Sequence, residues 1–301
     1  MGCILRGEII LKDTAVYGIK MTRPDIRGAK CKAPGIVLFV VMLIFAVVMF
    51  LPFLWMLSTS FKTGASIFAY PIQWIPKQFY LKNYHDVWTE VPFGLYYFNT
   101  IKVTVIITAA QLLFCSMAAY AFAKLRFPFK NGIFMLFMTA LMIPWQSIMI
   151  PQFMVIQKFG LYNTHLGYIL VQFFSAFGIF LLRQFFMGIP NELSEAAKID
   201  GCSEWGIYWR IIMPLSKAGL STLGIFTFTY MWNDYLTPLI YLNSDNLKTL
   251  QLGLQSFQTA HSMDYGAIMA GTVCALLPMV IVFAVGEKYF TKGVTFTGLK
   301  N

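Results

Sequence analysis

The chain has 301 residues, of which 58% are hydrophobic and only 12% are charged, and its mean hydropathy is +0.65. Soluble domains carry about 25% charged residues, so this composition excludes an ordinary soluble domain and indicates a membrane protein. We therefore assign the formal net charge of +10 to Lys and Arg in cytoplasmic loops, and we expect no nucleic-acid partner.

The chain begins with a polar, basic segment, 1–35, which we expect to be a cytoplasmic tail. The first apolar run, 36–57, is long enough to cross the hydrocarbon core of a bilayer. A segment rich in aromatic residues and proline follows, and it suits an external loop at the membrane interface. The second predicted span is 103–122, and a short basic turn follows it. The basic residues of this turn are Lys124, Arg126 and Lys130.

The third predicted span, 133–150, contains Pro144. Because proline removes a backbone donor and clashes with the preceding turn, we expect this helix to be kinked or broken. The fourth, fifth and sixth spans are predicted at 166–186, 220–241 and 268–285. The sequence therefore predicts an all-α membrane protein with six transmembrane helices.

The distribution of Lys and Arg orients these spans. With six spans and the N-terminus inside, about three quarters of the 23 Lys and Arg residues fall in segments on the same side of the membrane as the N-terminus. We therefore expect both termini to be cytoplasmic. The predicted domains are the N-terminal tail 1–35, the transmembrane domain 36–290 with a cytoplasmic loop 187–219, and the C-terminal tail 291–301.

In the predicted cytoplasmic loop between the fourth and fifth spans, the sequence predicts a short helix that begins at Asn191. One face of this helix is nearly flat because it contains two alanines, which lets another protein approach closely. The residues of this face are Leu193, Ala196, Ala197 and Asp200, which are spaced three or four positions apart. Gly201 then supplies a residue that tolerates a positive φ and ends the helix.

A second helix is predicted directly after this glycine, because Ser203 can cap its N-terminus. Its aromatic and apolar residues form an amphipathic stripe. The stripe consists of Trp205, Tyr208, Trp209 and Ile212. We expect Pro214 to end this helix. The segment thus predicts a docking helix, a glycine hinge, and a helix that lies against the membrane.

This segment resembles the EAA signature of ABC importer permeases. The matching residues are Glu195, Ala196, Ala197, Gly201, Ile211, Met213 and Pro214. Met213 stands where the family usually has leucine, a change that keeps the size and the apolar character. Further segments resemble the carbohydrate-uptake type of this family, the second permease of maltose-type importers. They are AYAFAKLRFPFKN at 119–131, IPNELSEAAKIDG at 189–201, YMWNDYLTPLIYL at 230–242 and the closing GVTFTGLK.

The resemblance implies a type I importer permease that pairs with a homologous second permease. It also implies two ATP-binding-cassette ATPase subunits on the cytoplasmic side and an extracytoplasmic solute-binding protein. In such permeases the Glu-Ala-Ala helix inserts into a cleft of the ATPase. The resemblance assigns this ATPase-coupling role to Glu195, Ala196, Ala197, Asp200 and Gly201.

The sequence contains no motif for catalysis. It lacks the G-x-x-x-x-G-K-[ST] loop that holds ATP phosphates, and it also lacks the H-E-x-x-H and G-x-S-x-G motifs. The five cysteines are scattered and predict neither a disulfide framework nor a metal site. We therefore expect a translocation subunit without catalytic residues, cofactor or metal, with ATP hydrolysis in partner subunits.

Asp234 is the clearest candidate for a contact with the transported solute, because a carboxylate within a span is costly and often functional. Its neighbours supply an amide and aromatic faces, which suit a hydroxyl-rich, sugar-like solute. The candidate substrate path consists of Gln111, Gln146, Trp232, Asn233, Asp234 and Tyr235. Alternatively, these polar side chains bond neighbouring helices and hold the bundle together.

The leading hypothesis is a permease subunit of an ABC importer in the cell membrane that translocates a sugar or oligosaccharide. The alternative is an ion-coupled secondary transporter or channel, which would be favoured by several ionisable residues within the spans or by an inverted repeat. A membrane scaffold for a cytoplasmic partner would leave the broken third span and the polar positions without a purpose.

Overall fold

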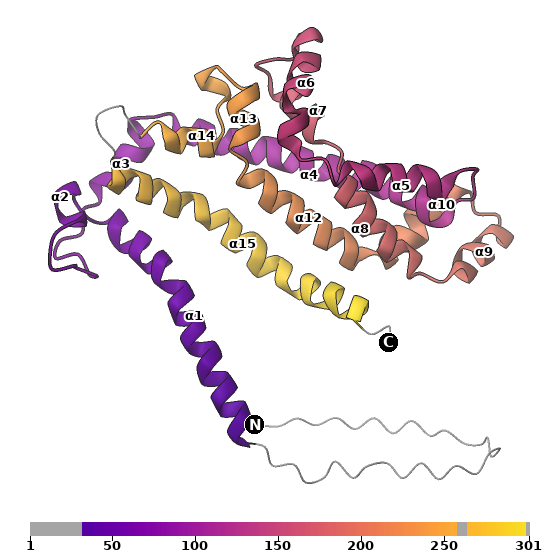
Figure 1. Cartoon of the computed structure of the whole chain (residues 1–301), viewed down its shortest axis with the longest axis horizontal. Coiled ribbons are helices and arrows are strands. Elements are labelled where there is room, and N and C mark those ends of the chain that lie inside the picture. The colour runs from indigo at the N-terminus through magenta and orange to yellow at the C-terminus, as the bar shows by residue number, and fades with distance from the viewer. Residues whose placement is uncertain (1–31, 258–263, 299–301) are drawn as a thin grey trace. The chain divides into compact units, whose positions relative to one another are not determined.

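The computed structural model describes residues 32–257 and 264–298, and within these ranges all regular elements are helical (Figure 1). The chain divides into two compact units, Met1–Leu51 and Pro52–Asn301. Almost all of the predicted N-terminal tail 1–35 lies outside the described residues. The prediction of an all-α chain is therefore confirmed for the part of the chain that the structure describes.

In the described ranges, three helices are long and apolar enough to cross a membrane, and there are up to six spans if each of three bent helix pairs is one span. The long helices are α1 (Lys32–Ser60), α4 (Phe93–Lys124) and α15 (Tyr265–Gly298). The bent pairs are α5 (Lys130–Ala140) with α6 (Trp145–Lys158), α7 (His165–Gln172) with α8 (Ala176–Met187), and Glu204–Leu215 with α12 (Lys217–Trp232).

The segment after α1 is folded back by buried polar contacts. Lys62 is 2% exposed, its Nζ donates to the Gln73 carbonyl, and it lies 4.2 Å from the centroid of the Trp55 ring. Burial lowers the pKa of Lys62. Asn83 in α3 (Lys82–Thr89) donates to the carbonyls of Ser60 and Lys62 at 2.9 and 2.8 Å. These contacts fix α3, and the short α2 (Gly64–Ile67) precedes it.

The core of the larger unit is built from α4, α8 and α12, which pack against one another (Figure 1). α15 packs against α12 and α3. A Cβ at Gly178 of α8 would lie 3.2 Å from Cys115 Sγ and 3.2 Å from Leu223 Cδ1. The absence of a side chain there allows α8 to lie close to α4 and α12, as small residues commonly do in membrane bundles.

The expected break in the third span is confirmed. α5 and α6 meet at an angle of 98°, and Pro144 is the residue that caps the start of α6. The fourth span is also bent, by 45° between α7 and α8. Here Ser175 Oγ accepts a hydrogen bond from Gly178 N at 3.1 Å and starts a new helix.

The fifth predicted span, 220–241, is interrupted in the structure. α12 ends at Trp232, and a separate helix, α13 (Leu236–Tyr241), follows. The break forms because Asp234 Oδ1 accepts from Thr237 N at 3.2 Å and caps α13. The carboxylate therefore lies between two helices. The short helices η2 (Asp245–Leu247) and α14 (Leu250–Gln255) follow.

The helix that contains the sixth predicted span, 268–285, extends beyond it at both ends, and its candidate membrane span is Tyr265–Gly286. α15 begins at Tyr265 and continues to Gly298, so most of the segment 291–301, expected as a tail, is helical in its backbone. Residues 299–301 lie outside the described residues.

Candidate coupling helix and candidate substrate path

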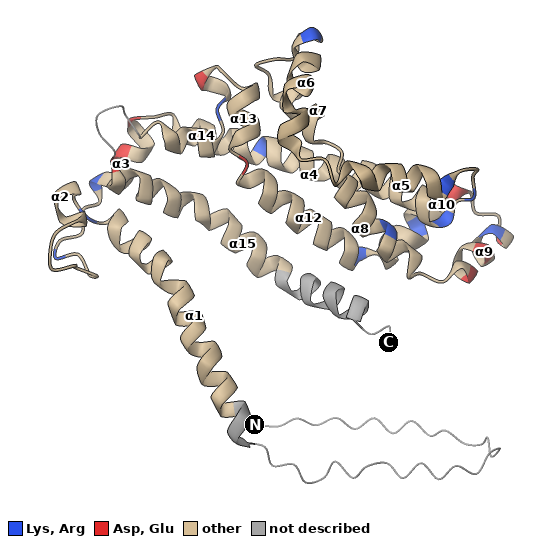
Figure 2. Ribbon diagram, in the orientation of Figure 1, with Lys and Arg blue, Asp and Glu red and all other residues tan. Residues whose placement is uncertain are grey.

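The helix α9 (Asn191–Ile199) carries the Glu-Ala-Ala residues. It ends in a Schellman motif: Cys202 N donates to Ala197 O at 2.9 Å and Gly201 N donates to Lys198 O at 3.1 Å. Gly201 has a φ of +81°, which glycine adopts without strain. The prediction that Gly201 ends this helix is confirmed. Figure 2 shows charged residues gathered around α9 and the neighbouring α10.

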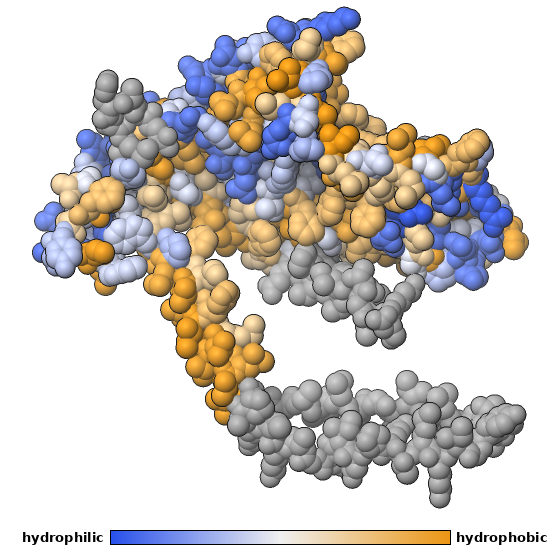
Figure 3. Space-filling view, in the orientation of Figure 1, coloured by the Kyte–Doolittle hydropathy of each residue, from blue (hydrophilic) through white to orange (hydrophobic). Residues whose placement is uncertain are grey.

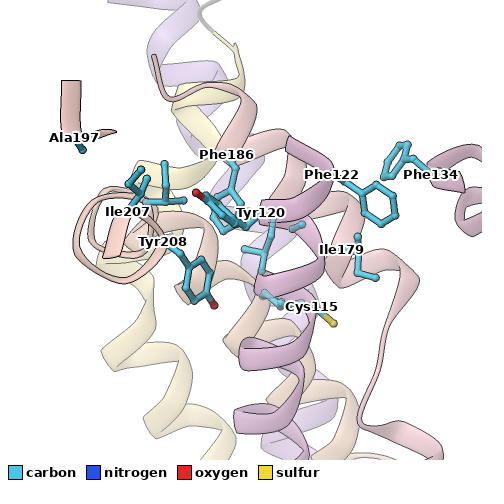
Figure 4. Packing of buried hydrophobic residues seen from close by; sticks show 13 residues of the cluster. Cys115, Tyr120, Phe122, Phe134, Ile179, Phe186, Ala197, Ile207 and Tyr208 are labelled. Atoms are coloured by element: carbon cyan, nitrogen blue, oxygen red, sulfur yellow. The ribbon is translucent and has the colours of Figure 1, made fainter. Parts of the chain in front are cut away.

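The flat face that the sequence predicts for α9 is only partly exposed: one part packs against the rest of the protein and the other part faces solvent. Ala197 is buried and packs into the hydrophobic core of this end of the molecule (Figure 4), and Ser194 is buried beside it. Glu195, Ala196 and Asp200 are exposed. The sequence pattern identified the right helix but not its orientation, because Ala is compatible with either environment. A partner that contacts α9 meets Glu195 and Ala196 directly.

Two groups of polar contacts, one at each end of α9, link this helix to the end of α4. At the start of α9, Lys124 Nζ donates to the carbonyl of Ile189 at 2.6 Å and to Asn191 Oδ1 at 2.8 Å. At its end, Lys198 Nζ lies 2.6 Å from Glu204 Oε1, and Glu204 Oε2 accepts from the hydroxyl of Tyr120 at 2.7 Å. We call these contacts the α9–α4 bridge.

The ion pair in the α9–α4 bridge is half exposed, with side-chain exposures of 51% for Lys198 and 44% for Glu204. A pair in this setting contributes at most about 1 kcal/mol. The bridge therefore fixes the direction of α9 more than it stabilises the fold. Both ends of α9 are therefore linked to α4, the first directly through Lys124 and the second through Glu204 of α10.

The second predicted helix is present. It consists of α10 (Glu204–Ile207), a π-helical turn η1 (Tyr208–Ile212) and α11 (Met213–Leu215). Ser203 Oγ accepts from Gly206 N at 3.2 Å, which confirms the predicted cap. This helix ends at Leu215, and α12 begins at Lys217 after a bend of 77°. The prediction that Pro214 ends the helix is therefore confirmed to within one residue.

The amphipathic stripe of this helix is split between two environments. Tyr208 and Ile212 are buried in the core, and the hydroxyl of Tyr208 lies 2.6 Å from Ser116 Oγ of α4. Trp205 and Trp209 are 59% and 49% exposed. π-helical turns often occur at functional sites, and this one anchors the segment after the hinge to α4.

A cavity of about 550 Å³ lies among α4, α6, α8 and α12 and contains one predicted path residue, Gln111. Gln111 is only 6% exposed. Its Nε2 donates to Gln172 O at 2.6 Å and its Oε1 accepts from Thr227 Oγ1 at 2.9 Å. The other lining residues with a polar side-chain atom are Trp145, Gln172, Ser175, Thr227 and Tyr230.

The other predicted path residues do not line this cavity. Trp232 is buried and its Nε1 donates to Ala275 O at 3.0 Å, while Asn233 Nδ2 donates to Thr229 O within its own helix at 2.9 Å. Asp234 Oδ2 accepts from the hydroxyl of Tyr168 at 3.1 Å. Tyr235 donates to Gln255 Oε1 at 2.6 Å, and Gln146 is exposed. Asp234 thus bonds a neighbouring helix, as the structural alternative required.

Several lining residues, among them Trp145 and Tyr230, were not among the candidates from the sequence. Trp145 directly follows Pro144, so the break predicted at this proline could have pointed to Trp145 as a lining residue. Tyr230 carried no signal of its own, because an aromatic residue in an apolar helix is usual. Among the described residues, no group of His, Cys, Asp or Glu could hold a metal ion.

Together with the comparisons that follow, this all-helical arrangement with three to six candidate spans identifies a membrane permease of the type I importer fold. Residues 111–295 match the family model "Binding-protein-dependent transport system inner membrane component". The chain belongs to this family. It is a permease subunit of an ABC importer, and ATP hydrolysis resides in a separate subunit.

Relatives of known name agree with this assignment. The chain is 35% identical to the arabinooligosaccharides transport system permease protein AraQ of Halalkalibacterium halodurans, over 83% of this chain and 90% of that protein. It is 34% identical to the lactose transport system permease protein LacG of Rhizobium radiobacter, over 87% and 96%. It is 31% identical to the diacetylchitobiose uptake system permease protein NgcG of Streptomyces coelicolor, over 84% and 85%.

A solved structure has the same fold. The crystal structure of a bacterial ABC transporter involved in the import of the acidic polysaccharide alginate contains a chain with a TM-score of 0.77 and 27% identity. The match covers 85% of this chain and 96% of that one. The family resemblance inferred from the Glu-Ala-Ala segment is therefore confirmed.

Proposed function

We propose that this chain translocates a sugar or oligosaccharide and that α9 couples this movement to the ATPase subunits. The observation that carries the proposal is the α9–α4 bridge, which ties both ends of the Glu-Ala-Ala helix to a core helix. The finer arrangement that we propose has six spans, with both termini in the cytoplasm. Its partners are a homologous second permease, two ATPase subunits and an extracytoplasmic solute-binding protein.

Coupling in this arrangement is mechanical. Glu195, Ala196 and Asp200 contact the ATPase, and Gly201 allows α9 and the following helix to keep a fixed angle. When ATP binding draws two ATPases together, α9 moves with them and displaces α4 through the bridge. The permease has only to exist in two states of different stability, which the ATPases bias.

The carbohydrate assignment is supported by the relatives, whose names refer to arabinooligosaccharides, lactose and diacetylchitobiose. The cavity around Gln111 offers amide and hydroxyl groups beside Trp145 and Tyr230. Such groups can bond sugar hydroxyls, while aromatic rings pack against the apolar faces of a sugar ring. We extend the substrate path from Gln111 to these two aromatic residues.

Coupling is tested by site-specific cross-linking in the assembled importer. In a variant without native cysteines, Ala196→Cys should form a cross-link to the ATPase subunit. Ser256→Cys is the matched control, because Ser256 is exposed but lies beyond α14, far along the chain from α9. Failure of Ala196→Cys to capture the ATPase, or equal capture by Ser256→Cys, would contradict the coupling role.

The substrate class is tested on the importer reconstituted with its solute-binding protein. Thermal shift of the binding protein identifies ligands from a panel of sugars, oligosaccharides, amino acids and polyamines. ATP-dependent uptake of the hits into vesicles then checks transport. Uptake of a sugar supports the proposal. Uptake confined to a non-carbohydrate, or uptake that continues without ATP, would overturn it.

A further inference from the structure

Two adjoining cavities of opposite character lie beside α9. The first is about 700 Å³ and is lined mainly by polar and charged residues. The second is about 220 Å³ and is mostly apolar. Tyr120, Leu125 and Glu204 line both cavities, so the polar and apolar spaces adjoin at these three residues. Figure 3 shows strongly hydrophilic residues beside hydrophobic ones at the end of the molecule that carries α9 and α10.

The larger cavity carries an excess of positive charge. Its basic residues are Lys124, Arg126, Lys130 and Lys198, and its acidic residues are Glu195 and Glu204. Only Lys198 is paired with a carboxylate there, that of Glu204. Lys130 Nζ donates to the neutral carbonyls of Ala123 and Leu125 at 3.2 and 2.8 Å.

Because these partners are neutral, they do not compensate the positive charge of Lys130. Lys124 also bonds only a carbonyl and an amide oxygen. Arg126 is exposed and has no hydrogen bond or ion pair within the described ranges. The larger cavity therefore presents cations that an anionic group would neutralise.

The smaller cavity suits a hydrocarbon chain. Its apolar lining comes from Met117, Ala121 and Leu125 of the α4 end and from the rings of Trp205 and Tyr208. Trp205 is 59% exposed. Tryptophan concentrates at membrane–water interfaces, so an exposed Trp at the edge of an apolar cavity is consistent with contact with lipid.

We propose that these two cavities form a binding site for an anionic phospholipid. The phosphate-bearing headgroup occupies the basic cavity, and the first part of one acyl chain lies in the apolar cavity beside Trp205. Basic pockets between membrane helices bind anionic headgroups in this way. Free phosphate shares the headgroup chemistry but would leave the apolar cavity unfilled. Phosphatidylcholine fills that cavity but brings no net negative charge.

The test uses the full chain in nanodiscs of phosphatidylcholine and phosphatidylglycerol, without ATPase. Either lipid is supplied with brominated acyl chains, which quench nearby tryptophan fluorescence. The contribution of Trp205 is the difference between the native chain and Trp205→Phe. We expect brominated phosphatidylglycerol to quench this contribution more strongly than brominated phosphatidylcholine at equal mole fraction.

The variant Arg126→Gln should lower the preference for phosphatidylglycerol about fivefold, the effect expected from one basic residue at an anionic membrane surface. Lys217→Gln is the matched control, since Lys217 is exposed but lines neither cavity, and it should leave the preference unchanged. Met117→Phe fills the apolar cavity without adding a tryptophan and should reduce quenching by both lipids.

Equal quenching by both lipids in the native chain would overturn the proposal, as would an equal loss in Arg126→Gln and Lys217→Gln. A third arm adds inorganic phosphate to the buffer. If phosphate abolishes the difference between lipids at constant ionic strength, the basic cavity binds free phosphate and the lipid proposal is wrong. Because no ATPase is present, failure of the coupling proposal would not change these results.

Discussion

Replacing Gly201 tests whether the angle between α9 and the following helix matters for transport. The residue has a φ of +81°, and its N–H donates to Lys198 O at 3.1 Å. No atom lies within 4 Å of an added Cβ, so the cost of Gly201→Ala is conformational. It amounts to about 1–2 kcal/mol, the penalty for a left-handed residue with a Cβ. Asn tolerates this conformation better, and Pro cannot adopt it and also removes the donor.

These costs predict an order of activity. The capped conformation should become roughly 5- to 30-fold less populated relative to alternatives in Gly201→Ala, and Gly201→Asn should lie between Gly and Ala. Gly201→Pro should abolish uptake while the chain stays inserted in the membrane. The assay is sugar uptake per ATP hydrolysed by the reconstituted importer, with insertion measured by membrane fractionation. Normal coupling in Gly201→Pro, or Asn performing worse than Ala, would refute the reasoning.

Four further predictions follow from the same geometry. Glu195→Lys should abolish uptake without changing melting temperature, because Glu195 is exposed and, under the coupling proposal, contacts the ATPase subunit. Glu204→Gln should lower stability by at most about 1 kcal/mol, yet reduce uptake per ATP hydrolysed, because it weakens the link to Lys198. Gln111→Leu should lower the melting temperature, since it leaves two buried bonds unmade, worth about 1–3 kcal/mol. Gly167→Ala should reduce the yield of folded protein, because its Cβ would lie 2.2 Å from Leu161 O; Gly132→Ala, with no atom within 4 Å of its Cβ, is the matched control.

Local signals in the sequence were sufficient to predict the end of α9 at Gly201 and the break in the third predicted span at Pro144. A glycine after a helix end and a proline between two apolar runs act through the backbone of a few neighbouring residues. Their effects therefore do not depend on the rest of the fold. Gly201 and Pro144 were predicted for this reason, and the structure agrees at both positions.

The orientation of side chains depended on contacts that the sequence does not show. Ala197 is buried because Ile207 and Tyr208 of the helix after the hinge contribute to the same core cluster, and no periodicity within α9 distinguishes it from Ala196. Asp234 was expected inside a span, but it caps α13 and bonds Tyr168, which is distant in the sequence. In both cases the deciding partner comes from another element.

The small buried area of α9 has a consequence for how it can work. Among its described side chains only Ser194 and Ala197 are buried, so apolar packing contributes little to its position. The α9–α4 bridge adds a half-exposed ion pair and a few hydrogen bonds, each worth about 1 kcal/mol. α9 is therefore held in a definite direction but weakly, and a docked ATPase would add a comparable amount of stabilisation. Under the coupling proposal, we expect a helix held in this way to follow the ATPase without unfolding the core, because the bridge reaches α4 only at its C-terminal end, at Tyr120 and Lys124.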